Sequence, residues 1–236
     1  MKKFIRYFIV FLVVFSLGAF LMYFYMSKHP TTFQEIITKS EKNVKIDDKG
    51  ISEAVDKVYD SVVTVSTYKK ESPYSSGTGF VYKVSGDVAY ILTNNHVISE
   101  ADDIYVTFTD DRKVKAKLVG FDNYSDIAVL SISKEDIIKI AVIGKSDNMK
   151  IGDTVFAVGA PLDNAYSWTV TRGVLSGKDR LVTVSQSNGL FSQSSYVMKV
   201  LQTDAAINSG NSGGPLANGN GEVVGITSLK LGGVVV

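Results

Sequence analysis

The sequence predicts an all-β protein of two antiparallel β-barrels, preceded by an N-terminal transmembrane helix. Short runs rich in β-branched and aromatic residues recur between turn residues from position 62 to 132. A second set of such runs follows from position 154 to 227, after a division near residues 139–150. Because strands of this length and spacing are typical of closed all-β folds, each set is expected to form its own barrel.

The N-terminal segment predicts a membrane anchor. Three basic residues among the first six precede an uncharged, largely apolar run over residues 7–26. A helix of that length spans roughly the 30 Å hydrocarbon core of a bilayer. A cleaved signal peptide is the alternative, but its apolar region is usually only about 7–15 residues long. The basic residues before the run, against Lys28 alone close after it, predict a cytoplasmic N-terminus and an extracytoplasmic domain.

Residues 27–50 are predicted to be a linker between this anchor and the folded domain. They carry mixed charges and show little apolar periodicity, which is typical of a tether. The domain is expected to occupy residues 51–236 and to begin with a short helix through Tyr59, capped by Ser52.

The strands of the two barrels are placed by alternation and by turn residues. For the first barrel the pattern predicts strands over residues 62–67, 79–84, 88–93, 104–109 and 127–132. For the second barrel it predicts residues 154–158, 169–174 and 196–202, then a hairpin from Leu216 to residues 222–227 around the turn 218–221.

One serine stands in an unusual glycine-rich setting. Ser212 lies in the segment Gly-Asn-Ser-Gly-Gly-Pro over residues 210–215. Glycines permit a tight bend that projects the serine hydroxyl while backbone N–H groups converge beside it. The same residues also occur in ordinary turns. Whether Ser212 is a nucleophile therefore depends on whether the chain also supplies a general base and a carboxylate for it.

A serine nucleophile needs a general base, normally histidine, and a carboxylate that orients that base. The chain has two histidines, and His29 follows directly on the apolar run, which leaves His96 at the end of an apolar strand. Asp126 is the favoured carboxylate because it immediately precedes an apolar strand. The remaining acidic candidates fall in polar, turn-like stretches and are read as solvated charges: Asp102, Asp103, Asp110, Asp111 and Asp122.

These residues resemble the trypsin-like serine proteases of the HtrA (Deg) group. The resemblance rests on four segments in the family's order, at residues 77–80, 93–97, 125–130 and 203–216. It implies a chymotrypsin-like fold with a catalytic triad of His96, Asp126 and Ser212 in the cleft between two barrels. It also implies an oxyanion hole formed by the backbone N–H groups of Gly210 and Ser212.

Substrate-binding residues follow from the same resemblance. Ala206 lies six positions before Ser212, at the base of the pocket for the side chain that precedes the cut, and Ile207 follows it. Since no acid is present there, small to medium apolar side chains are the expected preference. Ser228, Leu229 and Lys230 align with the edge strand that pairs with an extended substrate, and Lys230 can alter this preference.

The sequence therefore predicts a membrane-anchored extracytoplasmic serine endopeptidase. The resemblance implies misfolded or exported proteins as substrates, a homotrimer, and PDZ domains after the protease domain, so a chain ending at Val236 is expected to be a truncated fragment. The alternative is a non-catalytic peptide-binding module on a protease scaffold. An esterase-like hydrolase is disfavoured because the pattern lacks a Gly-x-Ser-x-Gly strand-to-helix turn.

Composition excludes several other classes. The formal net charge of +1 gives no reason to expect nucleic acid as a partner. The chain has no cysteine, so disulfides and thiolate metal sites cannot form, and two histidines predict no zinc cluster. No cofactor is expected.

Overall fold

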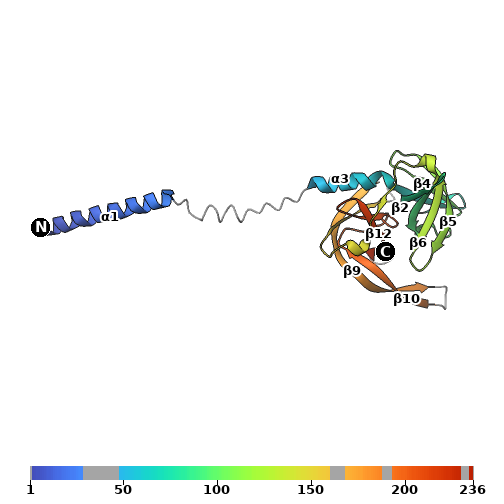
Figure 1. Ribbon diagram of the computed structural model, residues 1–236. Coiled ribbons are helices and arrows are strands. Elements are labelled where there is room, and N and C mark those ends of the chain that lie inside the picture. Colours follow the sequence, from blue (N-terminus) through green and yellow to red (C-terminus); the bar gives the residue numbers. More distant parts are fainter. Residues whose placement is uncertain (1, 29–47, 160–167, 188–192, 230–233, 236) are drawn as a thin grey trace. The chain divides into compact units, whose positions relative to one another are not determined.

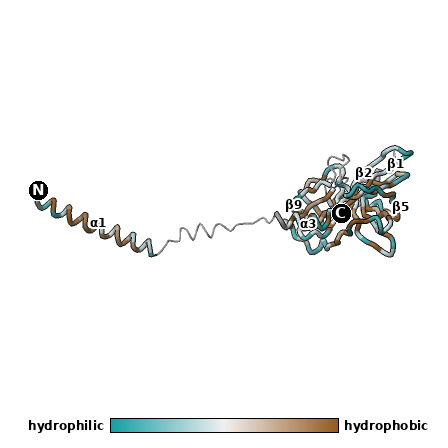
Figure 2. The backbone as a smooth tube through the Cα atoms, turned by 90° about the horizontal axis from the view of Figure 1, so that it is seen from above, coloured by the Kyte–Doolittle hydropathy of each residue, from teal (hydrophilic) through white to brown (hydrophobic). Residues whose placement is uncertain are grey.

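The computed structural model describes residues 2–28, 48–159, 168–187, 193–229 and 234–235, and the chain divides into two units, Met1–Ile46 and Asp47–Val236. Figure 1 shows the elements of both units in chain order. In the first unit, helix α1 covers Lys2–Lys28. Residues Lys3–Tyr25 have a mean hydropathy of 2.4, and Figure 2 shows the apolar colouring along the helix. By length and composition this helix can cross a membrane.

The second unit opens with an amphipathic helix, α3 (Asp48–Val58), followed by the 3₁₀ turn η1 (Tyr59–Ser61). The prediction that Ser52 caps this helix is wrong, because the helix begins one turn earlier at Asp48. Ala54 and Val58 are fully buried and anchor the helix on the β-structure. Most of the predicted linker, residues 29–47, lies outside the described residues.

The first barrel is closed and has six strands in the order β1-β2-β3-β6-β5-β4. Its strands are β1 (Val62–Lys69), β2 (Ser72–Ser85), β3 (Val88–Asn94), β4 (Asp103–Thr107), β5 (Lys113–Asp122) and β6 (Ile127–Ser133). Alternate side chains such as Val65, Ile91 and Leu130 are excluded from solvent and fill the interior. The prediction missed β5, whose first five residues alternate lysine with small apolar residues, so that only Ala116 is buried.

The second half is a seven-stranded sheet that forms a half-barrel, in the order β11-β8-β9-β10-β13-β12-β7, with a further pairing between β11 and β12. The strands are β7 (Val142–Ile143), β8 (Thr154–Gly159), β9 (Thr169–Ser187), β10 (Gln193–Thr203), β11 (Pro215–Asn218), β12 (Glu222–Ser228) and β13 (Val234–Val235). The sequence correctly predicted strands at the positions of β8, β9, β10, β11 and β12, but it missed β7 and placed the end of β9 about thirteen residues too early. Short helical turns complete the chain: α4 (Asn95–Ile98), η2 (Lys134–Asp136) and η3 (Ser146–Asn148).

One apolar cluster joins the two halves. Phe80 of the first barrel and Phe156 of the second sheet are both buried in it, together with the apolar face of α3. The backbone N–H of Thr78 on β2 also donates to the carbonyl of Ser212, at 2.8 Å. The predicted all-β fold is therefore confirmed, with one closed barrel and one half-barrel. The end of β3 pairs with the start of β6, and Ser228 at the end of β12 contacts Asp126, the residue before β6.

Candidate active site

His96 and Asp126 form a close, largely buried pair. His96 lies on α4, directly after β3, and its Nδ1 is 2.6 Å from the Asp126 Oδ2. The backbone N–H of His96 donates to the other carboxylate oxygen at 2.9 Å. The Asp126 side chain is only 3% exposed, whereas the imidazole is 29% exposed. Because an ionised carboxylate can only accept, Nδ1 carries the proton, which leaves Nε2 as the nitrogen that can act as a base.

The backbone of Asp126 is held in a conformation that few non-glycine residues adopt. Its φ is +55°, and its carbonyl accepts from the Asn95 N–H and from the Asn94 amide, both at 2.9 Å. The hydroxyl of Ser228 on β12 also donates to the Asp126 Oδ2, at 3.4 Å. Such a conformation costs of order 1–3 kcal/mol and persists only where surrounding contacts hold it.

Ser212 lies in a buried loop that packs against the first barrel. The Gly213 N–H donates to the Thr227 carbonyl at 2.8 Å, and the Thr78 hydroxyl donates to the Gly210 carbonyl. Gly213 needs to be glycine for two reasons. Its φ is +86°, and a Cβ there would lie 2.2 Å from the Thr78 carbonyl oxygen.

The Ser212 hydroxyl accepts a hydrogen bond from the backbone N–H of Leu229 at 3.1 Å. Within the described residues no hydrogen bond joins Ser212 to His96. The neighbours Ser228 and Leu229 instead bridge the two groups, since one contacts Asp126 and the other contacts Ser212. The structure thus brings the predicted residues to one place and joins His96 to Asp126 directly.

Two backbone donors beside the Ser212 hydroxyl lack an acceptor in the described part of the chain. They are the N–H groups of Gly210 and Ser212, both in buried residues, whereas Asn211, Gly213 and Gly214 N–H groups all donate to carbonyls. Buried N–H groups are normally paired, so this arrangement favours a ligand oxygen as acceptor. The oxyanion hole at Gly210 and Ser212 stays a prediction, and the two donors that are unpaired among the described residues agree with it.

The predicted specificity residues occupy different surroundings. The Ala206 carbonyl accepts from the Thr171 hydroxyl at 2.9 Å and from the Asn211 amide at 3.2 Å, which ties it to the nucleophile loop. Ile207 packs on the cluster that contains Leu175. Lys230 lies outside the described residues.

Sequence reasoning missed a polar hollow beside His96. It is lined by Tyr74, Ser75, Asn95, His96, Ser99, Glu100 and Asn123. The Asn95 amide donates to the Asn123 Oδ1 at 2.7 Å, so a residue next to His96 is joined to one near Asp126. The hydrogen bond from Lys69 and its charge hold the pKa of Glu100 below its usual range. Closeness in sequence to His96 and Asp126 was the signal that could have identified Asn95 and Asn123.

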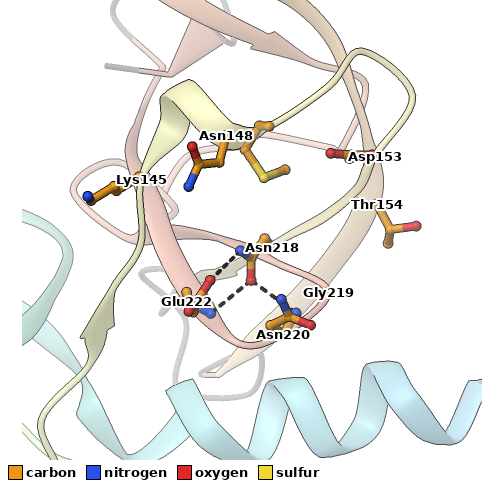
Figure 3. Close-up of a pocket in the computed structure, with 9 residues that line it drawn as sticks. Lys145, Asn148, Asp153, Thr154, Asn218, Gly219, Asn220 and Glu222 are labelled. Atoms are coloured by element: carbon orange, nitrogen blue, oxygen red, sulfur yellow. Dashed lines mark hydrogen bonds between the residues drawn. The ribbon is translucent and has the colours of Figure 1, made fainter.

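A second hollow, in the half-barrel, is drawn in Figure 3. There the Asn218 Oδ1 accepts from the N–H groups of Asn220 and Glu222, both at 3.0 Å, and its amide donates to the Glu222 carboxylate at 2.8 Å. These bonds close the predicted turn between β11 and β12. Across the described residues, no group of three or more His, Cys, Asp or Glu side chains is placed to hold a metal ion.

A closed six-stranded barrel, a half-barrel and this set of side chains define a trypsin-like peptidase domain. Residues 77–226 match the family model described as "Trypsin-like peptidase domain". The chain belongs to this family, as an HtrA/Deg-like member, and the predicted resemblance is confirmed.

Two curated relatives and one solved structure illustrate the similarity. "Serine protease Do-like HtrA" of Bacillus subtilis (strain 168) is 46% identical over 166 residues, which cover 70% of this chain and 36% of the relative. The protein of the same name from Lactococcus lactis subsp. lactis (strain IL1403) is 39% identical over 205 residues, covering 77% and 49%. The structure of "HtrA-type protease AlgW with tripeptide" has a TM-score of 0.64 and 34% identity, covering 79% of this chain and 59% of that one. The chain therefore spans about a third to a half of the length of these curated relatives.

Replacement of Gly213 by alanine is expected to destabilise the domain. The positive φ and the overlap with the Thr78 carbonyl together are expected to lower the free energy of unfolding by more than about 2 kcal/mol. Gly219→Ala is the matched control, since a Cβ there meets nothing within 4 Å. Urea denaturation of both variants measures the difference, and equal stabilities would contradict the packing described for the Ser212 loop.

Proposed function

We propose that the protein is a membrane-anchored, extracytoplasmic serine endopeptidase that works through an acyl-enzyme. The observation that carries the proposal is the hydrogen bond between the buried Asp126 carboxylate and the His96 ring. Near this pair lies Ser212, and the backbone N–H groups of Gly210 and Ser212 are unpaired within the described structure. A scaffold that only bound peptides would need neither the buried pair nor the free donors.

In the proposed reaction Ser212 is the nucleophile and His96 is the general base. The Ser212 Oγ attacks the scissile carbonyl carbon while its proton passes to the His96 Nε2, and Asp126 stabilises the imidazolium that forms. The N–H groups of Gly210 and Ser212 donate to the oxyanion of the tetrahedral intermediate. The intermediate collapses, the C–N bond breaks, and His96 returns the proton to the leaving amine. Water activated by His96 then hydrolyses the acyl-enzyme.

In this mechanism the Leu229 N–H is the hydrogen-bond partner of the Ser212 hydroxyl before substrate binds. It occupies one lone pair of Oγ and leaves the hydroxyl proton free to donate. Rotation of the serine side chain toward His96 is then the first motion that the reaction requires. An extended substrate that takes up the Leu229 N–H as a β-strand partner releases the serine in the same step.

Ser212→Ala tests the assignment of the nucleophile. The wild-type chain is expected to react with a fluorophosphonate probe, whereas the variant is expected to lose labelling and at least about 10⁴-fold in peptide hydrolysis. Ser209→Ala, three residues upstream in the same loop, is the matched control and should label normally. Labelling that persists in Ser212→Ala, or a folded wild type that never labels, would favour the non-catalytic peptide-binding alternative.

Specificity for small to medium apolar side chains before the cut is proposed from Ala206 and the absence of an acid at that position. A peptide library digested by the wild-type chain should therefore show cleavage after residues such as alanine or valine. Ala206→Asp should shift the ratio toward lysine and arginine by about tenfold or more, because it adds a charge partner for them. Wild-type cleavage mainly after basic residues would contradict the proposal.

Misfolded or exported proteins are the proposed substrates, and a homotrimer is the proposed assembly. Both come from the HtrA-like family membership and not from a contact in this chain. Light scattering of the purified chain measures the assembly, and degradation of an unfolded protein in preference to its folded form measures the substrate class.

The proposed topology places the N-terminus in the cytoplasm and the protease domain outside. The helix Lys2–Lys28 is long and apolar enough to span a bilayer, and basic residues precede its apolar run. The chain has no cysteine, so single cysteines report position cleanly. In intact cells an impermeant maleimide should label Gly219→Cys but not Lys3→Cys, and both should label after lysis. Labelling of Lys3→Cys in intact cells, or loss of the N-terminus from the mature chain, would contradict a cytoplasmic anchor.

A further inference from the structure

The outer half of the β9–β10 hairpin is a two-stranded ribbon. Residues 180–187 of β9 pair with residues 193–200 of β10, whereas the pairing of β9 with β8 covers only Thr169–Val174. In the described structure this ribbon has no third strand, and Figure 1 shows the hairpin projecting from the second sheet. Leu181 and Val197 on it are 74% and 63% exposed. Two strands alone are marginally stable, so side-chain contacts must set the ribbon's position.

One such contact reaches across to the first barrel. The ring of Tyr196 on the ribbon lies edge-on against the ring of Tyr124, with centroids 5.2 Å apart and planes at 82°. This is the favoured arrangement of two aromatic rings. Tyr124 is two residues before Asp126 and belongs to a tight turn over residues 122–126. The Asp122 carboxylate closes that turn by accepting from the backbone N–H groups of Tyr124 and Ser125, at 3.2 and 3.0 Å.

The turn needs support from outside because Asp126 has a φ of +55°. The hydrogen bonds from Asn94 and Asn95 hold the Asp126 carbonyl, and the Asn95 amide also holds the Asn123 Oδ1, whereas the ring of Tyr124 contacts the ring of Tyr196. Burial raises the pKa of the Tyr196 hydroxyl, and the negative charges of Asp126 and Asp122 raise it further. Tyr196 thus contacts the turn through the ring of Tyr124.

We propose that Tyr196 is a positioning residue that acts through Tyr124 to hold the Asp122–Asp126 turn, and with it the Asp126 carboxylate, against His96. The inference rests on the proposed function, because that function gives the His96–Asp126 pair its role. It adds a residue from the β9–β10 hairpin to the residues on which the reaction depends.

The test compares Tyr196→Ala, Tyr196→Phe and Val197→Thr in the full chain. Tyr196→Ala is expected to lower kcat by about 3- to 10-fold, the worth of one edge-to-face ring pair, with KM changed less than twofold. Tyr196→Phe keeps the ring and should restore kcat. Val197→Thr is the matched control and should leave kcat unchanged. Neighbouring strand residues point to opposite faces, so the Val197 side chain points away from the face that carries Tyr196.

A spectroscopic measurement separates this inference from the proposed function. The chain has only two histidines, so ¹⁵N-histidine labelling gives a resolvable signal for the His96 Nδ1 proton. We expect Tyr196→Ala to shift or broaden that signal and Tyr124→Ala to have the same effect, with no further change in the double variant. An unchanged signal and unchanged kcat in Tyr196→Ala would overturn the positioning role. A wild-type chain that fails to react with the fluorophosphonate probe overturns the proposed function alone, because the His96 signal still reports the contact.

Discussion

The buried carboxylate of Asp126 is the constraint on which the rest of the site depends. A carboxylate that is removed from water costs several kcal/mol unless donors surround it. Here the donors are the His96 backbone N–H, the His96 ring and the Ser228 hydroxyl, and they come from α4 and β12. Two of these donors belong to His96 beside the first barrel and the third to β12, so the set around the carboxylate is complete only when both halves are assembled.

The junction between the halves supplies that assembly. The apolar cluster around Phe80 and Phe156 brings the two sheets together and buries the face of α3. Thr78 then fixes the Ser212 loop to β2 through its backbone N–H. Apolar burial provides the main driving force, which is not directional, and a few hydrogen bonds set the register of the loop. A site between two sheets can therefore be as well defined as one within a single sheet.

The sequence predicted the candidate site from residues that carry strong local signals, and the structure joins two of them, His96 and Asp126. The glycines around Ser212 and the strands that end at His96 and begin after Asp126 predicted the site, because turns and alternation are local properties. The strand β5 was missed because lysines occupy its outward positions and leave a weak apolar pattern. The Tyr124–Tyr196 contact could not be predicted, since it joins residues 72 positions apart through a hairpin whose length no local pattern indicated. The partner of the Ser212 hydroxyl likewise depends on where β12 lies in space.

In the proposed mechanism, the bond from the Leu229 N–H to the Ser212 hydroxyl links substrate binding to reactivity. Leu229 follows Ser228, which donates to Asp126, so any shift of this segment changes the surroundings of both Ser212 and the His96–Asp126 pair. A single backbone hydrogen bond contributes only about 1 kcal/mol net, so an incoming peptide strand can replace it without a large barrier. Binding of an extended peptide along this edge and release of the nucleophile are then two results of one exchange of hydrogen bonds. A peptide too short to reach the Leu229 N–H would leave the serine in its resting position, and its cleavage would suffer in kcat more than in KM.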